Sequence, residues 1–234
     1  MISLKKTVIC VLLITVICAV AFFISPAGDI IFASNEQMSR IRVIVDAGHG
    51  GFDGGAMAGD GTVEKDINLS ISVFLKGFLE QSGFEVILTR DSDTGTDDDS
   101  SEKIAVRKKS DLRNRLNLMQ KYPDAIFVSV HLNKFTTSAA SGAQVFYSKN
   151  HSNSSRLGQC VQGSIISLLQ KENTRVIKQA TSSTYLLNNA TIPAIIVECG
   201  FLSNAGDLAL LKDEAYQRKM AFCIYSGIKE YYKE

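Results

Sequence analysis

Three short apolar segments of this 234-residue chain lead into polar side chains of the types that bind metals or transfer protons. The segments are residues 41–45, 125–130 and 194–197, and the polar residues that follow them are Asp46, His49, His131 and Glu198. Continuous apolar runs of this length are typical of strands buried on both faces. In open α/β sheets the carboxyl ends of such strands meet at one crevice. We therefore expect these side chains to lie close together.

Two histidines and two carboxylates can build a catalytic zinc site. Such a site uses three nitrogen or oxygen ligands and keeps one position open. His49, His131 and Glu64 can supply the three ligands, and Glu198 is then left as the proton acceptor for an activated water. The spacing is no local signature such as HExxH, so hydrogen-bonded structural histidines stay open as the alternative.

Other chemistries have weaker support in the sequence. Cys199 can act as a thiol nucleophile beside His131, but reactive thiols favour cationic surroundings and Cys199 follows a carboxylate. The glycine-rich loop is no dinucleotide fingerprint, because Asp53 stands where the third glycine belongs. We expect His151, in a loop rich in serine and asparagine, to be exposed to solvent.

The elements that must position these side chains alternate between strands and helices. Apolar runs separated by amphipathic segments predict one α/β domain with a mainly parallel sheet covered on both faces. A polar acidic loop over 92–103 is expected to be solvated, and the segment 142–147 fits a sheet edge. The expected strands are 41–45, 84–88, 125–130, 142–147 and 194–197, and the expected helices run from Glu64 to just before Gly83, over 110–121, over 157–169 and after Asp213.

The N-terminus carries the pattern of an export signal. Lys5 and Lys6 precede an uncharged apolar run over 7–24, which is close to the length that spans a bilayer. We expect residues 1–33 to be a signal peptide or a membrane-contacting anchor. A short linker over 34–40 and one domain over 41–234 would follow.

The charge balance excludes a strongly basic protein. The chain has 25 lysines and arginines against 24 aspartates and glutamates, so we expect no nucleic-acid partner. Five basic residues border the expected second helix, and a solvated helix face is favoured for them over a patch for an anionic ligand. They are Arg107, Lys108, Lys109, Arg113 and Arg115.

Across residues 41–234 the chain resembles the zinc-dependent N-acetylmuramoyl-L-alanine amidases of the amidase type 3 family. The resemblance implies one zinc ion held by His49, Glu64 and His131, with Glu198 as the catalytic carboxylate. It implies hydrolysis of the amide between the lactyl group of N-acetylmuramic acid and L-alanine in peptidoglycan. It also implies a twisted sheet of about six strands with helices on both faces. The matching segments are VIVDAGHGGFDGGA, EKDINL, LTRDSD, LRNRLNL, FVSVHLN and IIVECGFLSN.

Four further residues are candidates for the surroundings of the metal or for the substrate groove. Asp46 is the candidate to orient His49, because it lies three residues before it. Leu132 stands where the family often has alanine, so we expect it to reshape the groove. Asn133 and Arg113 complete the set.

Within the family the chain looks most like the spore-associated amidases, given its size, its export segment and its lack of a wall-binding repeat. This implies action on cortex peptidoglycan that leads, with a separate deacetylase, to muramic lactam and germination. It places the enzyme in the cell wall or the forespore intermembrane space, where an accessory or membrane-associated protein can position it. A division or autolytic amidase of the same chemistry and a non-catalytic wall-binding scaffold are the alternatives.

Overall fold

The computed structural model describes residues 41–98 and 103–233. The expected signal or anchor over 1–33 and the linker over 34–40 lie outside these residues. Within the described ranges, no helix is both long enough and apolar enough to span a bilayer.

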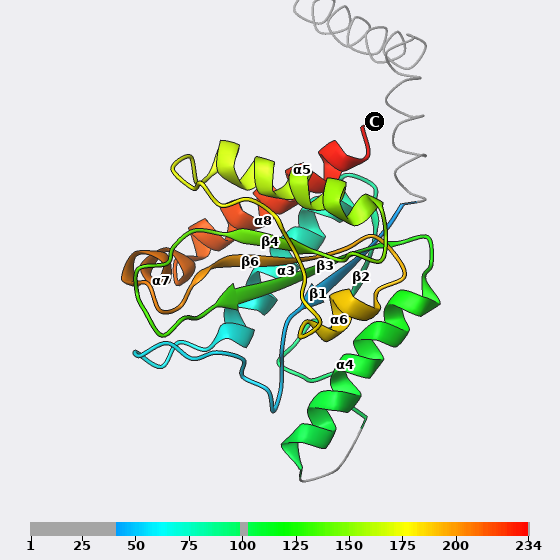
Figure 1. Cartoon of the computed structure of the whole chain (residues 1–234), viewed down its shortest axis with the longest axis horizontal. Helices are drawn as coiled ribbons and strands as arrows, with labels where there is room; N and C mark the ends of the chain where they lie inside the picture. The colour runs from blue at the N-terminus through cyan, green and yellow to red at the C-terminus, as the bar shows by residue number, and fades with distance from the viewer. Residues whose placement is uncertain (1–40, 99–102, 234) are drawn as a thin grey trace, which may run out of the picture.

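One six-stranded sheet forms the centre of the molecule, with the strand order β2-β1-β3-β6-β4-β5 (Figure 1). All neighbouring strands are parallel except β4 and β6, which pair antiparallel. The sequence therefore predicted the fold class correctly. The strands are β1 (Arg42–Ala47), β2 (Glu85–Leu88), β3 (Ile126–Asn133), β4 (Gln144–Tyr147), β5 (Lys178–Gln179) and β6 (Ala194–Phe201).

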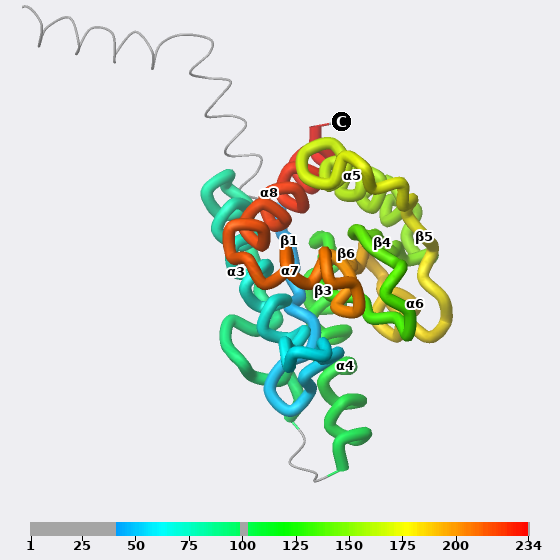
Figure 2. The backbone as a smooth tube through the Cα atoms, turned by 90° about the vertical axis from the view of Figure 1, so that its left-hand side faces the viewer, coloured from blue at the N-terminus to red at the C-terminus, as the bar shows by residue number. Residues whose placement is uncertain are grey.

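Helices cover both faces of the sheet, as Figure 2 shows. α3, α5 and α8 pack on one face around the larger apolar core, and α4 and α6 pack on the other around a smaller one. The helices are α3 (Glu64–Gln81), α4 (Ile104–Lys121), α5 (Asn153–Leu168), α6 (Tyr185–Asn189), α7 (Ala205–Leu211) and α8 (Glu214–Tyr231).

Side-chain periodicity explains the main elements. In α3, Ile71, Leu75 and Leu79 recur at helical spacing and are fully buried. The helix ends before Gly83, whose φ of 87° is a backbone conformation that glycine adopts without strain. In β3, Val128 and Val130 face the larger core, so the residues that alternate with them, Ser129 and His131, face the α4 side.

The structure departs from the sequence predictions at several surface elements. α4 begins at Ile104 and not at Ser110. Ile104, in the first turn, is 61% exposed, so the start of the helix lacks the amphipathic pattern by which a helix is predicted. β4 is not at the edge of the sheet, because the two-residue strand β5 pairs with it there. α6, α7 and β5 were not predicted; each is too short for a periodic signal.

Two solvated positions were also predicted incorrectly. Asp97 in the acidic loop accepts a hydrogen bond of 2.7 Å from Arg107 Nε, and its side chain is only 6% exposed. His151 is half-buried, and its Nδ1 accepts a hydrogen bond from the backbone N–H of Asn153. Both residues take local hydrogen-bond partners that composition alone does not reveal.

Candidate metal centre and active site

His49, Glu64 and His131 come together at the carboxyl edge of the sheet. His49 lies in the loop after β1, Glu64 is the first residue of α3, and His131 lies near the end of β3. Each residue offers one atom that could bind a metal, and these three atoms lie within 4.8 Å of one another. Glu64 Oε1 is 3.0 Å from His131 Nδ1 and 3.3 Å from His49 Nε2. The predicted convergence of these three side chains is therefore confirmed.

The glycine-rich loop allows the histidines to approach so closely. His49 has a φ of 62°, the only positive value outside glycine among the described residues. A Cβ atom at Gly48 would collide with the His131 ring, and one at Gly55 would press against both His49 and Glu64. Glycine is therefore required at both positions for the three side chains to meet.

Glu64 is held rigidly by groups outside the cluster. Its Oε1 accepts hydrogen bonds from the backbone N–H of Leu132 at 3.0 Å and from Asn68 Nδ2 at 3.3 Å. Its Oε2 accepts one from the backbone N–H of Ala56 at 2.8 Å. Burial alone would raise the pKa of Glu64, but its hydrogen bonds with His131 and His49 outweigh burial and lower it. Glu64 is thus an ionised carboxylate in a fixed position, as a metal ligand must be.

Asp53 orients the His49 ring. Its Oδ2 lies 2.8 Å from His49 Nδ1, and its Oδ1 lies 2.9 Å from Lys108 Nζ. Because an ionised carboxylate only accepts hydrogen bonds, Nδ1 carries a proton, and Nε2, which faces Glu64, is the nitrogen that would bind a metal after losing its own proton. Burial lowers the pKa of His49, but the bonds with Asp53 and Glu64 outweigh it and raise the pKa to about 9. The expectation that Asp46 orients this ring is therefore wrong, and the role of Asp53 was not predicted.

Asp46 acts on a different part of the site. It is fully buried, accepts a hydrogen bond from Thr89 Oγ1 at 2.8 Å and forms an ion pair with Arg115. Arg115 Nη2 in turn donates to the backbone oxygen of His49 at 2.8 Å. Asp46 therefore supports the main chain at His49 through Arg115 and does not contact the ring.

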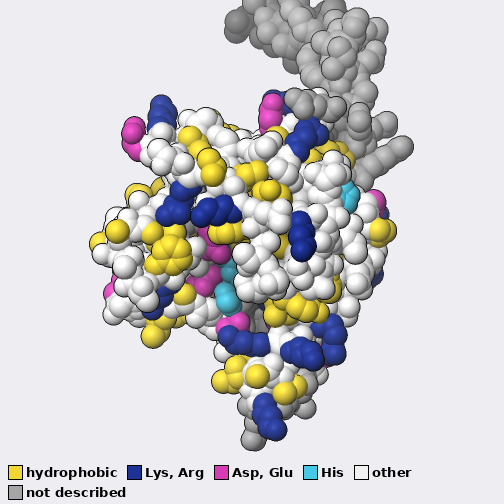
Figure 3. Space-filling view, in the orientation of Figure 1, with side chains coloured by type: hydrophobic (Ala, Val, Ile, Leu, Met, Phe, Trp, Pro, Cys, Tyr) yellow, Lys and Arg dark blue, Asp and Glu magenta, His cyan; other side chains and the backbone are white. Residues whose placement is uncertain are grey.

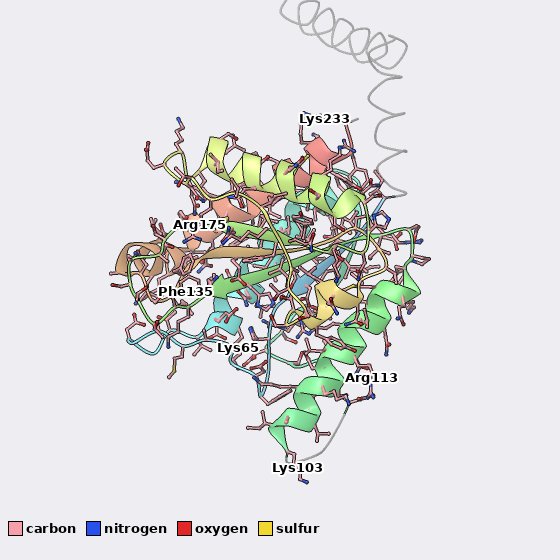
Figure 4. All side chains as sticks on the ribbon, viewed as in Figure 1. Lys65, Lys103, Arg113, Phe135, Arg175 and Lys233 are labelled. Carbon is pink, nitrogen blue, oxygen red and sulfur yellow. The ribbon has the colours of Figure 1, made fainter. Side chains whose placement is uncertain are left out.

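The basic residues of α4 have different environments. Arg113 and Lys109 are exposed as expected, and Figure 4 labels Arg113 on the outside of α4. The solvated position expected for Arg115 is wrong, because its side chain is only 2% exposed. Asp111, one turn before it, binds its Nε at 2.7 Å. Helical spacing places Arg115 on the face that packs against the sheet, and this signal was present in the sequence.

Glu198 lies beside the cluster on β6. It is the Cα partner of His131 in the parallel pairing of β3 and β6. Its Oε2 is buried and has no hydrogen-bond partner among the described residues. Burial raises the pKa of Glu198 to about 7. A carboxyl group with a free oxygen and a pKa near neutrality is suited to accept and return a proton.

The residues present fit a zinc ion. Two imidazoles and one carboxylate form a preferred donor set for a catalytic zinc, and the three side chains already converge. Both histidines line a cavity of about 240 Å³ that also reaches Lys108 and Leu186. In Figure 3, histidine and acidic side chains lie in a hollow at the centre of the visible face.

The remaining candidates lie outside this cavity or face away from it. Cys199 is fully buried in the larger core, and burial together with the Glu198 charge raises its pKa well above the ordinary value. Leu132 packs in the same core, so the expectation that its side chain reshapes the groove is wrong. Only its backbone N–H reaches the site, through Glu64. Asn133 is half-buried at the end of β3.

A mainly parallel α/β sheet that carries, at its strand ends, a His-Glu-His cluster able to hold a metal ion and a neighbouring glutamate is an arrangement suited to a hydrolase. The pattern of the N-acetylmuramoyl-L-alanine amidases matches residues 43–230, and the chain belongs to this family. Its activity is therefore hydrolysis of the N-acetylmuramoyl-L-alanine amide of peptidoglycan.

Individual relatives agree with this assignment. The germination-specific N-acetylmuramoyl-L-alanine amidase of Bacillus subtilis is 35% identical over 82% of this chain and 80% of its own length. The amidase LytC of the same organism is 30% identical over 82% of this chain and 35% of its own length. The CwlD amidase of Clostridioides difficile, solved in complex with the GerS lipoprotein, is 41% identical with a TM-score of 0.79, covering 82% of this chain and 98% of that one.

Proposed function

We propose that the chain is a zinc-dependent amidase in which His49, Glu64 and His131 hold one zinc ion and Glu198 transfers the proton. The observation that supports this most directly is the pairing of a preformed three-ligand cluster with a neighbouring glutamate. The ligand atoms lie within 4.8 Å of one another, and Glu198 Oε2 is buried without a partner.

The chain's own residues account for the proton transfers. Bound zinc would supply Lewis-acid polarisation of the lactyl carbonyl and a lowered pKa for water. Glu198 accepts the proton of the attacking water at Oε2 and gives it to the amine nitrogen of L-alanine as the amide bond breaks. Asp53 and Arg115 keep His49 in place during both steps, through its ring and its backbone oxygen respectively.

We further propose spore cortex peptidoglycan as the substrate, with removal of stem peptides preceding the formation of muramic lactam by way of a separate deacetylase. The germination-specific relative of Bacillus subtilis supports this role. A vegetative wall amidase is the second candidate, because LytC is also 30% identical. The two roles share the chemistry and differ only in the wall that is cleaved.

For placement, we propose that residues 1–33 direct export and that the protein works outside the cytoplasm, in the cell wall or the forespore intermembrane space. These residues would be a cleaved signal or a membrane-contacting anchor. The complex of the CwlD amidase with a lipoprotein supports an accessory, membrane-associated partner for this chain too.

Mass spectrometry of peptidoglycan fragments tests the chemistry and the substrate together. The detergent-solubilised full chain, loaded with zinc, should release stem peptides with free N-terminal L-alanine, and faster from cortex than from vegetative peptidoglycan. Chelation should stop the release and added zinc restore it. Glu198→Gln should lose at least about 100-fold in rate, while Glu214→Gln, at an exposed position of α8, should not.

Each part of the proposal can fail separately. Undiminished release after chelation would contradict the metal, and an active Glu198→Gln would contradict the proton transfer. Equal rates on the two walls would leave the amidase standing and remove the cortex preference.

A further inference from the structure

Arg175 has only neutral partners among the described residues. It lies in the segment between α5 and β5 and is half-buried. Its guanidinium carbon is 4.7 Å from the centre of the Phe201 ring. Its Nε donates to the backbone oxygen of Ser141 at 2.7 Å, and its Nη1 donates to Gln144 Oε1 at 3.1 Å. A guanidinium has five N–H donors, so this fixed group keeps donors available.

The sheet places Arg175 next to the proposed proton-transfer residue. Gln144 on β4 is the Cα partner of Glu198 on β6, just as His131 on β3 is its partner on the other side. Directly opposed residues share one face of a sheet, with Cβ atoms about 4.5–5.5 Å apart. His131, Glu198 and Gln144 therefore form a row across three strands, and the guanidinium of Arg175 is attached to the end of that row.

Figures 3 and 4 give the same view of this arrangement. In Figure 4, Arg175 lies above Phe135, and Lys65 lies below both. The hollow with its acidic and histidine side chains in Figure 3 lies between the heights of Arg175 and Lys65. Arg175 also borders an open cavity of about 610 Å³, which is separate from the cavity that the two histidines line and leaves one side of Arg175 open.

The cations on the other side of the metal cluster are already neutralised. Lys108 pairs with Asp53, and Arg115 pairs with Asp46 and Asp111. No such carboxylate pairs with Arg175 among the described residues.

Two acids line the same open cavity, and neither forms an ion pair with Arg175 among the described residues. Glu172 is exposed, and Asp207 Oδ2 accepts hydrogen bonds from the backbone N–H groups of Gly142 and Phe201. The positive charge of Arg175 is thus held in position and left for a ligand.

We propose that Arg175 binds the carboxylate of the second residue of the stem peptide, on the L-alanine side of the cleaved amide. The inference rests on the amidase function proposed above. One strand spacing of about 4.8 Å separates Glu198 from Gln144, and an extended peptide advances about 3.5 Å per residue. A peptide whose L-alanine amide lies at Glu198 and whose chain runs across the strands towards Gln144 would place its second residue on the side where Arg175 is bound to Gln144. Guanidinium and carboxylate can join through two parallel hydrogen bonds.

Two substrates that differ at a single group test this contact. N-acetylmuramoyl-L-alanyl-γ-D-glutamyl-L-lysine carries the free α-carboxylate of the second residue, and its D-isoglutaminyl analogue carries a carboxamide in that place; in both compounds the γ-carboxyl group is bonded to the lysine. The zinc-loaded full chain should have a kcat/KM about tenfold or more higher for the acid, in line with the strength of charge-assisted hydrogen bonds. Arg175→Gln should lose this preference through a higher KM for the acid, with the amide substrate unaffected. Arg175→Lys should retain part of it.

Arg218→Gln is the matched control. Arg218 is an exposed residue of α8 whose guanidinium carbon also lies 4.7 Å from the centre of a phenylalanine ring, that of Phe74. This variant should keep the full preference for the acid. The inference is overturned if the wild type does not prefer the acid, or if Arg175→Gln slows both substrates equally.

Cleavage of neither compound by a wild type that still cleaves whole peptidoglycan would overturn the inference and leave the amidase function intact. If the wild type cleaves neither the two compounds nor whole peptidoglycan, both the Arg175 inference and the amidase function are overturned.

Discussion

Replacement of Arg115 by leucine should destabilise the fold strongly while removing little volume from the interior. The side chains of Arg115 and Asp46 are 2% and 1% exposed, so both charges are out of water. Arg115 also donates to the backbone oxygens of Ala47 at 3.0 Å and His49 at 2.8 Å. The leucine variant leaves Asp46 as an uncompensated buried charge and leaves both carbonyl groups without this donor.

The expected loss is about 3–5 kcal/mol, the cost of breaking a buried ion pair by removing one partner. This is a large fraction of the roughly 5–15 kcal/mol by which native domains are stable. Urea unfolding of the full chain at pH 7, followed by far-ultraviolet circular dichroism, measures the loss. Arg113→Leu, two residues earlier on the exposed face of α4, should shift the free energy of unfolding by no more than about 0.5 kcal/mol.

The pH dependence separates this ion pair from simple packing. Burial favours a higher pKa for Asp46, but the charge of Arg115 outweighs it and holds the pKa below its ordinary value. The stabilisation is therefore complete above the unfolded pKa of about 3.9 and is lost as the pH falls through the folded pKa. Without Arg115 the pKa of Asp46 should rise, so the difference between variant and wild type should shrink as the pH falls towards about 4. A loss below about 1 kcal/mol at pH 7, or a difference independent of pH, would refute this reasoning.

Three further predictions concern the site itself. Asp53→Asn should weaken zinc binding about 10–100-fold, because Asp53 holds the proton on His49 Nδ1; competition with a chromophoric chelator measures this, and unchanged affinity would contradict it. Cys199→Ala should have a kcat within about threefold of the wild-type value, because the thiol is buried and protonated. A folded but inactive variant would support the thiol mechanism instead. Gly48→Ala should lower zinc affinity by at least about tenfold, since its Cβ collides with the His131 ring; binding at wild-type strength would show that the loop adapts.

The sequence predicted the metal cluster because its position follows from chain direction. Parallel strands deliver the residues after their carboxyl ends to one edge, and His131 and Glu198 lie at such ends. The same rule does not predict Asp53 as the partner of His49. That contact occurs with a positive φ at His49, a conformation uncommon outside glycine that the sequence around His49 does not specify.

Arg115 marks another limit of the sequence analysis. A basic residue in a run of five basic residues suggests a solvated surface, and composition cannot separate it from its exposed neighbours. Its helical spacing with Asp111 was visible in the sequence, but its partner Asp46 is 69 positions away. Long-range ion pairs of this kind depend on how α4 crosses the sheet, which the periodicity of the helix does not determine.

Glu64 and Glu198 show how one fold gives two carboxyl groups different properties. Glu64 receives hydrogen bonds from two backbone N–H groups and Asn68, and its pKa is lowered. Glu198 Oε2 receives none from the described residues, and burial raises the pKa of that residue to about 7. Leaving a buried acceptor unpaired costs about 1–3 kcal/mol, yet a hydrogen bond to Oε2 would occupy the oxygen that we propose takes up a proton. Environments that separate the pKa values of paired carboxyl groups in this way assign one as a permanent anion and the other as an acid and base. This division supports Glu64 as a ligand and Glu198 as the group that transfers the proton.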